Sequence, residues 1–573
     1  MLSLRIFHCL CCTRDSLTRS FILDEDILNS AITGSTADAE TWALVQGWLD
    51  ACTEGHRTCS SHAAKGFAPT RLLELDGVGW EQTFRLVDSA QLTSPMEPYV
   101  TLSHCWGPGP VEEKLRLVHA TEDMLRNGMP ASRLPRLFRD ALEIADRLGV
   151  RYIWIDRLCI IQDSAEDWAT EAATMQTVYQ NGFLNIAALG AKSDKDGCFF
   201  DRDPLVVAPT IINISPPGHE PLLFRFELEE DDGWRSTFEG EPLVSRAWVL
   251  QERVLAARTL YFGSKQVFWE CHEANRCETD PARNLIKPAA PSIPHPPRCS
   301  DGKPVQSSWK MLIDPGRSSI GSWRSIVQSY SHCGLTFAND KLVAISGLAK
   351  DMSKKMKRQG LKSQPNAYLA GLWKDEMPAS LLWHMESPAH RRPEYCAPSW
   401  SWASLDGIMG YGRGPHRDFF HANIVGARTV LRGEDAMGEV IGGSIVLSGP
   451  LCVLADGRAV RHFDDDREHH LFRTLNHPDT GLRLNVNYTR IRVDFDARED
   501  HQEVVLLVIC SDPNEQWGYL RAIGLALAPV QGIPSRFRRV GFVEFKVQAE
   551  EDEVIDCEKD LVNRIPNKSV EIV

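Results

Sequence analysis

The chain has 573 residues, of which 43% are hydrophobic and 24% are charged, so it can bury a sizeable core and is not disordered throughout. Its 63 Lys and Arg against 77 Asp and Glu give a net charge of −14. Without a basic run, this balance excludes a nucleic-acid-binding body. No apolar run reaches about 18 residues, so no transmembrane segment is expected. The length predicts about three to four domains.

The 16 cysteines are scattered along the chain, which predicts reduced thiols and a cytoplasmic location. Cys52, His56 and Cys59 lie close together in an N-terminal flanking region, residues 1–97. A structural zinc site needs four ligands, and no fourth ligand stands at a standard spacing. The sequence therefore favours a packed thiol cluster, assigns no metal, and leaves zinc binding by these residues open.

Strands and helices are predicted to alternate after residue 97. The pattern predicts strands at 99–103, 150–156 and 183–189, and helices at 134–148 and 168–179. This order implies right-handed crossovers and a parallel sheet with flanking helices. A ligand crevice in such a sheet lies beyond the carboxyl ends of the strands. The segments 103–107 and 156–162 fall there.

The predicted secondary structure of the rest of the chain is first largely helical and then rich in strands. A helix is predicted to open at Arg246, followed by a hairpin at 259–269, a Pro-rich exposed loop at 286–306 and a helical region at 321–390. Short strands beyond residue 399 predict a C-terminal β-rich domain. Four regions are predicted. They are an N-terminal flank (1–97), a central α/β domain (98–255), a hairpin and helical region (256–395), and a β-rich domain (396–573).

Two carboxylates are candidates for a catalytic or binding role. Asp156 follows an apolar strand, where it either binds a ribose hydroxyl or bonds to backbone N–H groups. Glu252 lies one helical turn after Trp248. A carboxyl group packed against an aromatic side chain has a raised pKa, which suits acid–base catalysis or glycosyl transfer. The alternative for Glu252 is an ion pair with Arg246 or Arg253.

A thiol nucleophile is a further hypothesis at the same strand ends. His104, Cys105 and Cys159 are of the residue types that a Cys–His pair requires. Such a pair also needs an orienting group and an oxyanion hole. The favoured interpretation is therefore that these thiols are packing groups.

Several blocks occur together in a fixed order. They are Tyr99-Val-Thr-Leu-Ser-His-Cys-Trp-Gly107, Leu134-Pro with Asp140-Ala, Leu148-Gly-Val-Arg-Tyr-Ile-Trp-Ile-Asp156, Leu158-Cys-Ile-Ile-Gln-Asp163, Asp167-Trp168, Met175 with Tyr179, and Arg246-x-Trp-x-x-Gln-Glu252. Over just over a quarter of the chain, this order resembles the heterokaryon incompatibility (HET) domain of filamentous fungi. One departure is Arg157, where the family more often has an uncharged residue.

The resemblance implies a role in fungal nonself recognition with regulated cell death. It also implies a distant relation to Toll/interleukin-receptor-like (TIR) domains, hence a flavodoxin-like sheet. Some TIR-like domains cleave NAD with a glutamate in a Trp-Cys-x-x-Glu stretch, and Trp248 to Glu252 has the same spacing, with Val249 in place of the Cys. The implied site has Glu252 as the catalytic residue. The residues expected to line it are Ser103, Trp106, Gly107, Asp156, Arg246 and Trp248.

Different functional classes therefore stay open. The first is a signalling or death-effector module that self-associates or binds another incompatibility protein, without a cofactor. The second is an NAD glycohydrolase-like enzyme with NAD as its substrate. A third is an accessory or regulatory protein of a fungal gene cluster.

Overall fold

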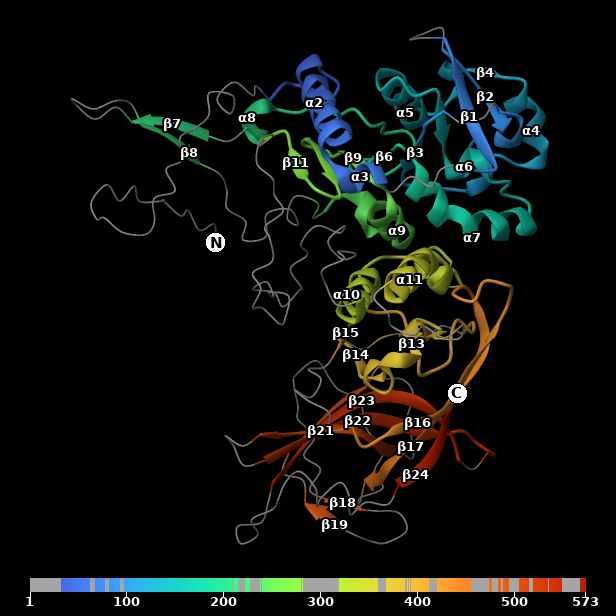
Figure 1. Ribbon diagram of the computed structural model, residues 1–573, viewed down its shortest axis with the longest axis vertical. Coiled ribbons are helices and arrows are strands. Elements are labelled where there is room, and N and C mark those ends of the chain that lie inside the picture. Colours follow the sequence, from blue (N-terminus) through green and yellow to red (C-terminus); the bar gives the residue numbers. More distant parts are fainter. Residues whose placement is uncertain are drawn as a thin grey trace. The chain divides into compact units, whose positions relative to one another are not determined.

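The computed structural model describes most of the chain, in two compact units, Met1–Asp314 and Pro315–Val573 (Figure 1). The described residues are 32–61, 67–77, 82–92, 97–208, 210–214, 222–226, 238, 240–279, 281, 319–337, 339–358, 367–386, 389, 391, 393–411, 420–454, 474–476, 483–485, 488–493, 504–514, 519–533, 535–548 and 567–573. The Pro-rich segment predicted at 286–306 lies outside them.

A mixed sheet forms the centre of the first unit, with nine strands in the described part of the chain. They are β1 (Arg71–Asp76), β2 (Thr83–Asp88), β3 (Tyr99–Ser103), β4 (Met129–Pro130), β5 (Tyr152–Trp154), β6 (Leu184–Ala187), β9 (Arg258–Phe262), β10 (Val267–Cys271) and β11 (Asn275–Cys277). Their order is β11-β10-β9-β6-β3-β5-β1-β2-β4. A separate hairpin joins β7 (Thr210–Ile214) to β8 (Leu222–Phe226).

The predicted parallel arrangement holds only for the four central strands. β5, β3, β6 and β9 are parallel to their neighbours in this group, whereas β1, β2 and β4 on one side and β10 and β11 on the other pair antiparallel. Only six residues separate β1 from β2 and only four separate β9 from β10, whereas a parallel connection needs about a dozen or more. The sheet also takes strands from both sides of the predicted central range, 98–255.

Helices cover both faces of the parallel centre. The helices described in this unit are α2 (Ala39–Gly55), α3 (Arg57–Ser61), α4 (His119–Arg126), α5 (Arg136–Arg147), α6 (Asp156–Cys159), α7 (Ala165–Asn181), α8 (Pro204–Val207) and α9 (Ala247–Leu255). The chain moves in opposite directions from β3 to β5 and from β5 to β6, so right-handed crossovers place α5 and α7 on opposite faces. Figure 1 shows α5 on one face and α7 with α9 on the other.

The order of the parallel strands creates a switch point at β3. From this strand the chain passes to β5 on one side and later to β6 on the other side. In open α/β sheets, ligands bind beyond the carboxyl ends of the strands at such a switch point. Every residue of β3 and β6 is buried, as expected for strands covered on both faces.

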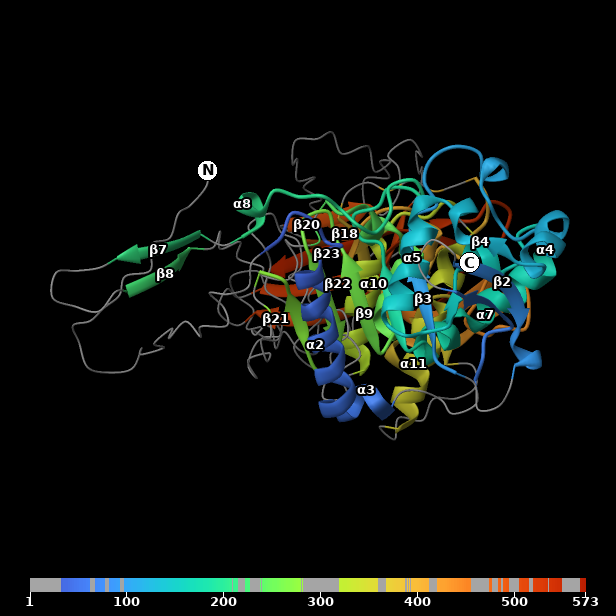
Figure 2. The same ribbon diagram turned by 90° about the horizontal axis from the view of Figure 1, so that it is seen from above.

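The N-terminal helix α2 packs against the antiparallel edge of the sheet, next to β10. Both views place it there (Figures 1 and 2). A buried ion pair joins Arg202 to Glu278, at 2.5 Å between Nη1 and Oε2, and Thr41 of α2 donates to Glu278 over 2.7 Å. Polar contacts therefore fix one end of α2 to the β11 side of the sheet.

The second unit begins with two helices, as predicted, but the later part of the predicted helical region is not helical. α10 (Ser319–Ser331) and α11 (Asp340–Arg358) are followed by short strands β12 (Tyr368–Leu369), β13 (Leu372–Trp373), β14 (Trp383–Met385) and β15 (Met409–Tyr411). The turn between β12 and β13 has φ +95° at Gly371, where a Cβ would lie 2.5 Å from the Trp402 ring nitrogen. This conformation and close approach end any helix there.

A large antiparallel sheet completes the second unit and confirms the predicted β-rich region. Its described strands are β16 (Asn423–Leu431), β17 (Val440–Leu454), β18 (Thr474–Asn476), β19 (Arg483–Asn485), β20 (Tyr488–Val493), β21 (Val505–Asn514), β22 (Tyr519–Pro529), β23 (Arg536–Gln548) and β24 (Asn567–Ile572). β24 pairs with both β17 and β23, in parallel with the latter.

Candidate functional site

The carboxyl edge of the parallel strands brings together side chains from three separate parts of the first unit. Ser103 ends β3, Asp156 follows β5, and Glu252 comes from α9. Helices α7 and α9 pack against each other on the same face. This packing places Glu252 beside Ser103 and beside Tyr179 of α7.

Glu252 is buried, and the hydroxyl groups of Ser103 and Tyr179 lie close enough to its carboxyl group to lower its pKa. These three residues are called the Glu252 cluster below. Burial raises the pKa of Glu252 to about 7, against the lowering effects of the Ser103 hydroxyl, the Arg246 charge and the Tyr179 hydroxyl. Among the residues that the structure describes, its Oε2 atom has no hydrogen-bond partner. A carboxyl group with this pKa can exchange a proton near neutral pH.

Ser103 and Tyr179 are themselves firmly placed. Ser103 Oγ lies 3.0 Å from Nδ2 and 3.1 Å from Oδ1 of Asn185, which lies on the adjacent strand β6. Burial raises the pKa of Tyr179 well above its ordinary value, so its hydroxyl stays a proton donor. The Tyr179 ring packs edge-on against Trp154, with ring centroids 5.7 Å apart.

Asp156 lies at the rim of the same edge, with 24% of its side chain exposed. Trp106 Nε1 donates to its Oδ2 over 3.0 Å, and the backbone N–H of Arg157 donates to its Oδ1 over 2.6 Å. His104 Nδ1 is 3.6 Å from the same Oδ1 atom. The carboxylate is thus oriented by an indole and a backbone N–H and still reaches solvent.

The thiols at this edge have the character of packing groups. Burial raises the pKa of Cys105, and it raises that of Cys159 to about 12. Burial also lowers the pKa of His104 to about 4, and its ring packs edge-on against Phe138 at 5.1 Å. Because the thiolate is the nucleophile, the Cys–His hypothesis has no support from these environments.

Gly107 is required by the backbone at the turn after β3. Its φ is +78°, and a Cβ would lie 2.5 Å from Cβ of Ser193 in the loop after β6. Its carbonyl accepts a hydrogen bond from Lys114 Nζ over 2.6 Å. This close approach holds the loops after β3 and β6 against each other.

Arg246 and Trp248 stand at the start of α9. The Arg246 guanidinium donates to the His104 carbonyl and lies near enough to Glu252 to lower its pKa. Trp248 packs edge-on against Trp168 of α7, with ring centroids 6.4 Å apart. Arg253, the other predicted partner of Glu252, instead contacts Tyr261, with 3.0 Å between Nε and the hydroxyl oxygen.

Arg157, the departure from the family pattern, has a partner of its own. Its side chain is fully buried, and Nη2 lies 2.7 Å from Oδ2 of Asp194 in the loop after β6. Its guanidinium also stacks over Phe138 at 4.6 Å. The charge is therefore compensated, and the pair links the loop after β5 to the loop after β6.

Tyr179 and Asn185 are site residues that sequence reasoning missed. The helical pattern placed Tyr179 on a buried face but gave no partner for its hydroxyl. Asn185 interrupts an apolar buried strand, and an amide in such a place always needs partners. That interruption is the signal that could have found it.

A second cluster forms at the antiparallel edge, from Cys52, His56, Cys59 and Cys271. These four residues are called the Cys/His cluster below. Their ligand atoms all lie within 4.8 Å of one another. The sequence had favoured a packed thiol cluster for the first three residues and left zinc binding open. Cys271 is 215 residues from His56 and joins the set because β10 runs beside α2.

In the described part of the chain, no helix is both long enough and apolar enough to cross a membrane. No curated protein and no solved structure matches the chain. Residues 99–252 match the family model described as "Heterokaryon incompatibility protein (HET)". The match begins with β3, ends at Glu252 and confirms the resemblance expected from the sequence. The chain therefore carries a heterokaryon incompatibility domain over about a quarter of its length.

Proposed function

We propose that this protein is a heterokaryon-incompatibility effector that acts in the cytoplasm in nonself recognition and triggers regulated cell death. The observation that carries the proposal is the family match over residues 99–252. Self-association, or association with another incompatibility protein, is the proposed mode of signalling. The order β5-β3-β6-β9 of the parallel strands is the flavodoxin-like order, which supports the proposed distant relation to TIR domains.

Inducible expression in a filamentous fungus tests the effector role. We expect the wild-type chain to reduce viability, and Gly107→Ala to abolish that effect because the added Cβ meets Ser193. Gly109→Ala is the matched control: Gly109 also has a positive φ, of +90°, but open space around it. Normal growth of cells that accumulate the wild-type protein would contradict the proposal.

The Glu252 cluster supports a second candidate function, the cleavage of NAD. In this reaction the bond between ribose C1′ and the nicotinamide nitrogen breaks, and its electron pair stays on nicotinamide. The Glu252 carboxylate would stabilise the positive charge at C1′, and water would then add there and release a proton. The supporting observation is that Oε2 of Glu252 has no hydrogen-bond partner in the described part of the chain. The carboxyl group has a pKa of about 7 and lies at the strand edge where α/β proteins bind nucleotides.

Nicotinamide release from NAD by the purified full chain tests this second candidate. We expect release by the wild type, loss of release in Glu252→Gln, and unchanged release in the control Glu40→Gln, because Glu40 is exposed on α2. Circular dichroism checks that the variants fold. No release by the wild type, including at high protein concentration with a crowding agent, would exclude the enzymatic function and leave the effector role standing.

A further inference from the structure

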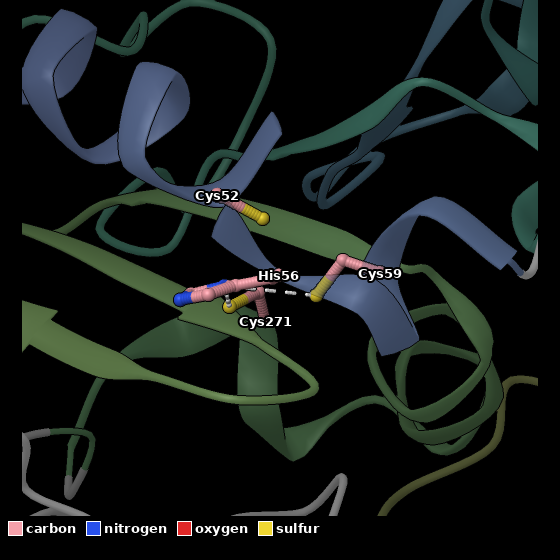
Figure 3. Close-up of side chains that lie close together, drawn as sticks. All are labelled: Cys52, His56, Cys59 and Cys271. Atoms are coloured by element: carbon pink, nitrogen blue, oxygen red, sulfur yellow. Dashed lines mark hydrogen bonds between the residues drawn. The ribbon is translucent and has the colours of Figure 1, made fainter. Parts of the chain in front are cut away.

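The Cys/His cluster gathers four potential metal ligands from segments that are distant in the sequence. Cys52 lies on α2, His56 follows that helix, Cys59 lies on α3 and Cys271 ends β10. Figure 3 shows the four side chains converging between these elements. Nδ1 of His56 is 3.3 Å from Sγ of Cys271 and 3.9 Å from Sγ of Cys59.

We propose that these residues bind one structural zinc ion. Three thiolates and one imidazole form a closed zinc donor set, and bond lengths of about 2.3 Å to sulfur and 2.0 Å to nitrogen place tetrahedral ligand atoms about 3.5–3.8 Å apart. The four ligand atoms, all within 4.8 Å of one another, need only small side-chain movements to reach that geometry. All three cysteines are buried and outside any disulfide, and His56 is half-buried, so most of the ion's surroundings are protein.

Groups around the cluster are arranged to stabilise thiolates. The backbone N–H of Ala274 donates to Cys271 Sγ over 3.3 Å, and Arg258 Nε donates to Cys52 Sγ over 3.2 Å. Three thiolates around a divalent ion leave a net charge of −1, which the Arg258 guanidinium compensates. Such outer partners orient the ligands and tune the affinity of a metal site.

A contact that needs no metal already fixes the α3 side of the cluster. The backbone N–H of Thr58 donates to Oε1 of Glu273 over 2.7 Å, which holds the start of α3 beside the turn after β10. The ligands are therefore brought together by the fold and do not have to be gathered by the ion. The zinc ion fastens the C-terminal end of α2, while Glu278 holds its other half.

Metal analysis of the untagged full chain, purified without chelator, tests the proposal. We expect about one zinc ion per chain, and almost none in Cys271→Ser. Cys277→Ser is the matched control, because Cys277 is also buried and lies on the adjacent strand β11 but outside the cluster; it should keep its zinc. A zinc-free wild type, bound iron in place of zinc, or equal zinc in Cys271→Ser and wild type would overturn the proposal.

Cobalt spectroscopy keeps the proposal testable if Cys271→Ser fails to fold. After removal of zinc, the wild-type chain should bind Co²⁺ with the intense visible absorption of a tetrahedral thiolate site. His56→Cys keeps four ligands, so it should still bind Co²⁺, with a spectrum shifted towards that of four thiolates. Weak absorption typical of octahedral Co²⁺ in the wild type, or an unshifted spectrum in His56→Cys, would contradict the assignment.

Discussion

The Glu252 cluster and the Cys/His cluster are both buried in the first unit, but their polar atoms are of different kinds. Glu252 lies beside two hydroxyl groups and the Arg246 charge, all of which lower its pKa. The Cys/His cluster instead gathers four electron-pair donors around one point. The comparison teaches that two buried clusters can differ in what would complete them: the Glu252 cluster leaves one carboxyl oxygen without a hydrogen-bond partner among the described residues, whereas the Cys/His cluster would take up a cation.

Removal of zinc should have the largest effect on the stability of the folded chain. A ligand present at about 1,000 times its Kd stabilises the folded state by about 4 kcal/mol, which corresponds to roughly 10 °C in the Tm of a large unit. We expect a chelator to lower the Tm of the first unit by that order, measured by calorimetry on the full chain. An unchanged Tm after verified removal of zinc would show that the two clusters are alike in needing no ligand.

Removal of one hydroxyl from the Glu252 cluster should have an intermediate effect. Tyr179→Phe keeps the ring that packs against Trp154 but leaves Glu252 with one donor fewer, at a cost of about 1–3 kcal/mol in the free energy of unfolding. Urea unfolding measures this cost. The control is Tyr99→Phe, which loses a buried hydrogen bond to the Val178 carbonyl without touching Glu252. Only Tyr179→Phe should also change the pH dependence of stability.

The smallest effect concerns pH. Burial raises the pKa of Glu252 from 4.5 to about 7, so the folded state holds this proton more tightly than the unfolded state does. Protonation of Glu252 therefore stabilises the folded state fully at pH values below 4.5, and this stabilisation is lost as pH rises to 7. Between about pH 6 and about pH 8, the loss is about 1 kcal/mol. Glu252→Gln cannot titrate and should not show this loss.

The comparison of Glu252→Gln with the wild type is essential, because His104 titrates in the opposite sense. Burial lowers the pKa of His104 from 6.5 to about 4, so its contribution to stability is present above pH 6.5 and is lost as pH falls towards 4. Urea unfolding of both proteins across the same pH range isolates the Glu252 effect as a difference. Parallel curves for variant and wild type would contradict the raised pKa.

The elements that position the Glu252 cluster were predictable because each has a strong local signal. The segments 99–103 and 183–189 are short apolar runs bounded by turn residues, and the helix that begins near Arg246 follows a clear pattern. Since parallel strands end at one edge of a sheet, the proximity of Ser103 and Asp156 follows from their places in the sequence.

Other features depend on contacts that no local pattern contains. Cys271 could not be assigned to the Cys/His cluster from the sequence. It joins the cluster because α2 packs against β10, and this packing arises only when the whole sheet has formed. The antiparallel strand β1 gains its partner β5 only from the folded core. In the second unit, the helical prediction is wrong around Gly371, because a turn held against Trp402 replaces the helix.

The close contact of Gly107 with Ser193 has a consequence for how this edge can respond to anything that binds it. Together with the Arg157–Asp194 pair and the Arg246 bond to the His104 carbonyl, it couples the three strand-end loops and the start of α9 into one rim. Displacing one of these segments therefore breaks a contact with another. A substitution at any one of these positions would then be expected to change the contacts of the others.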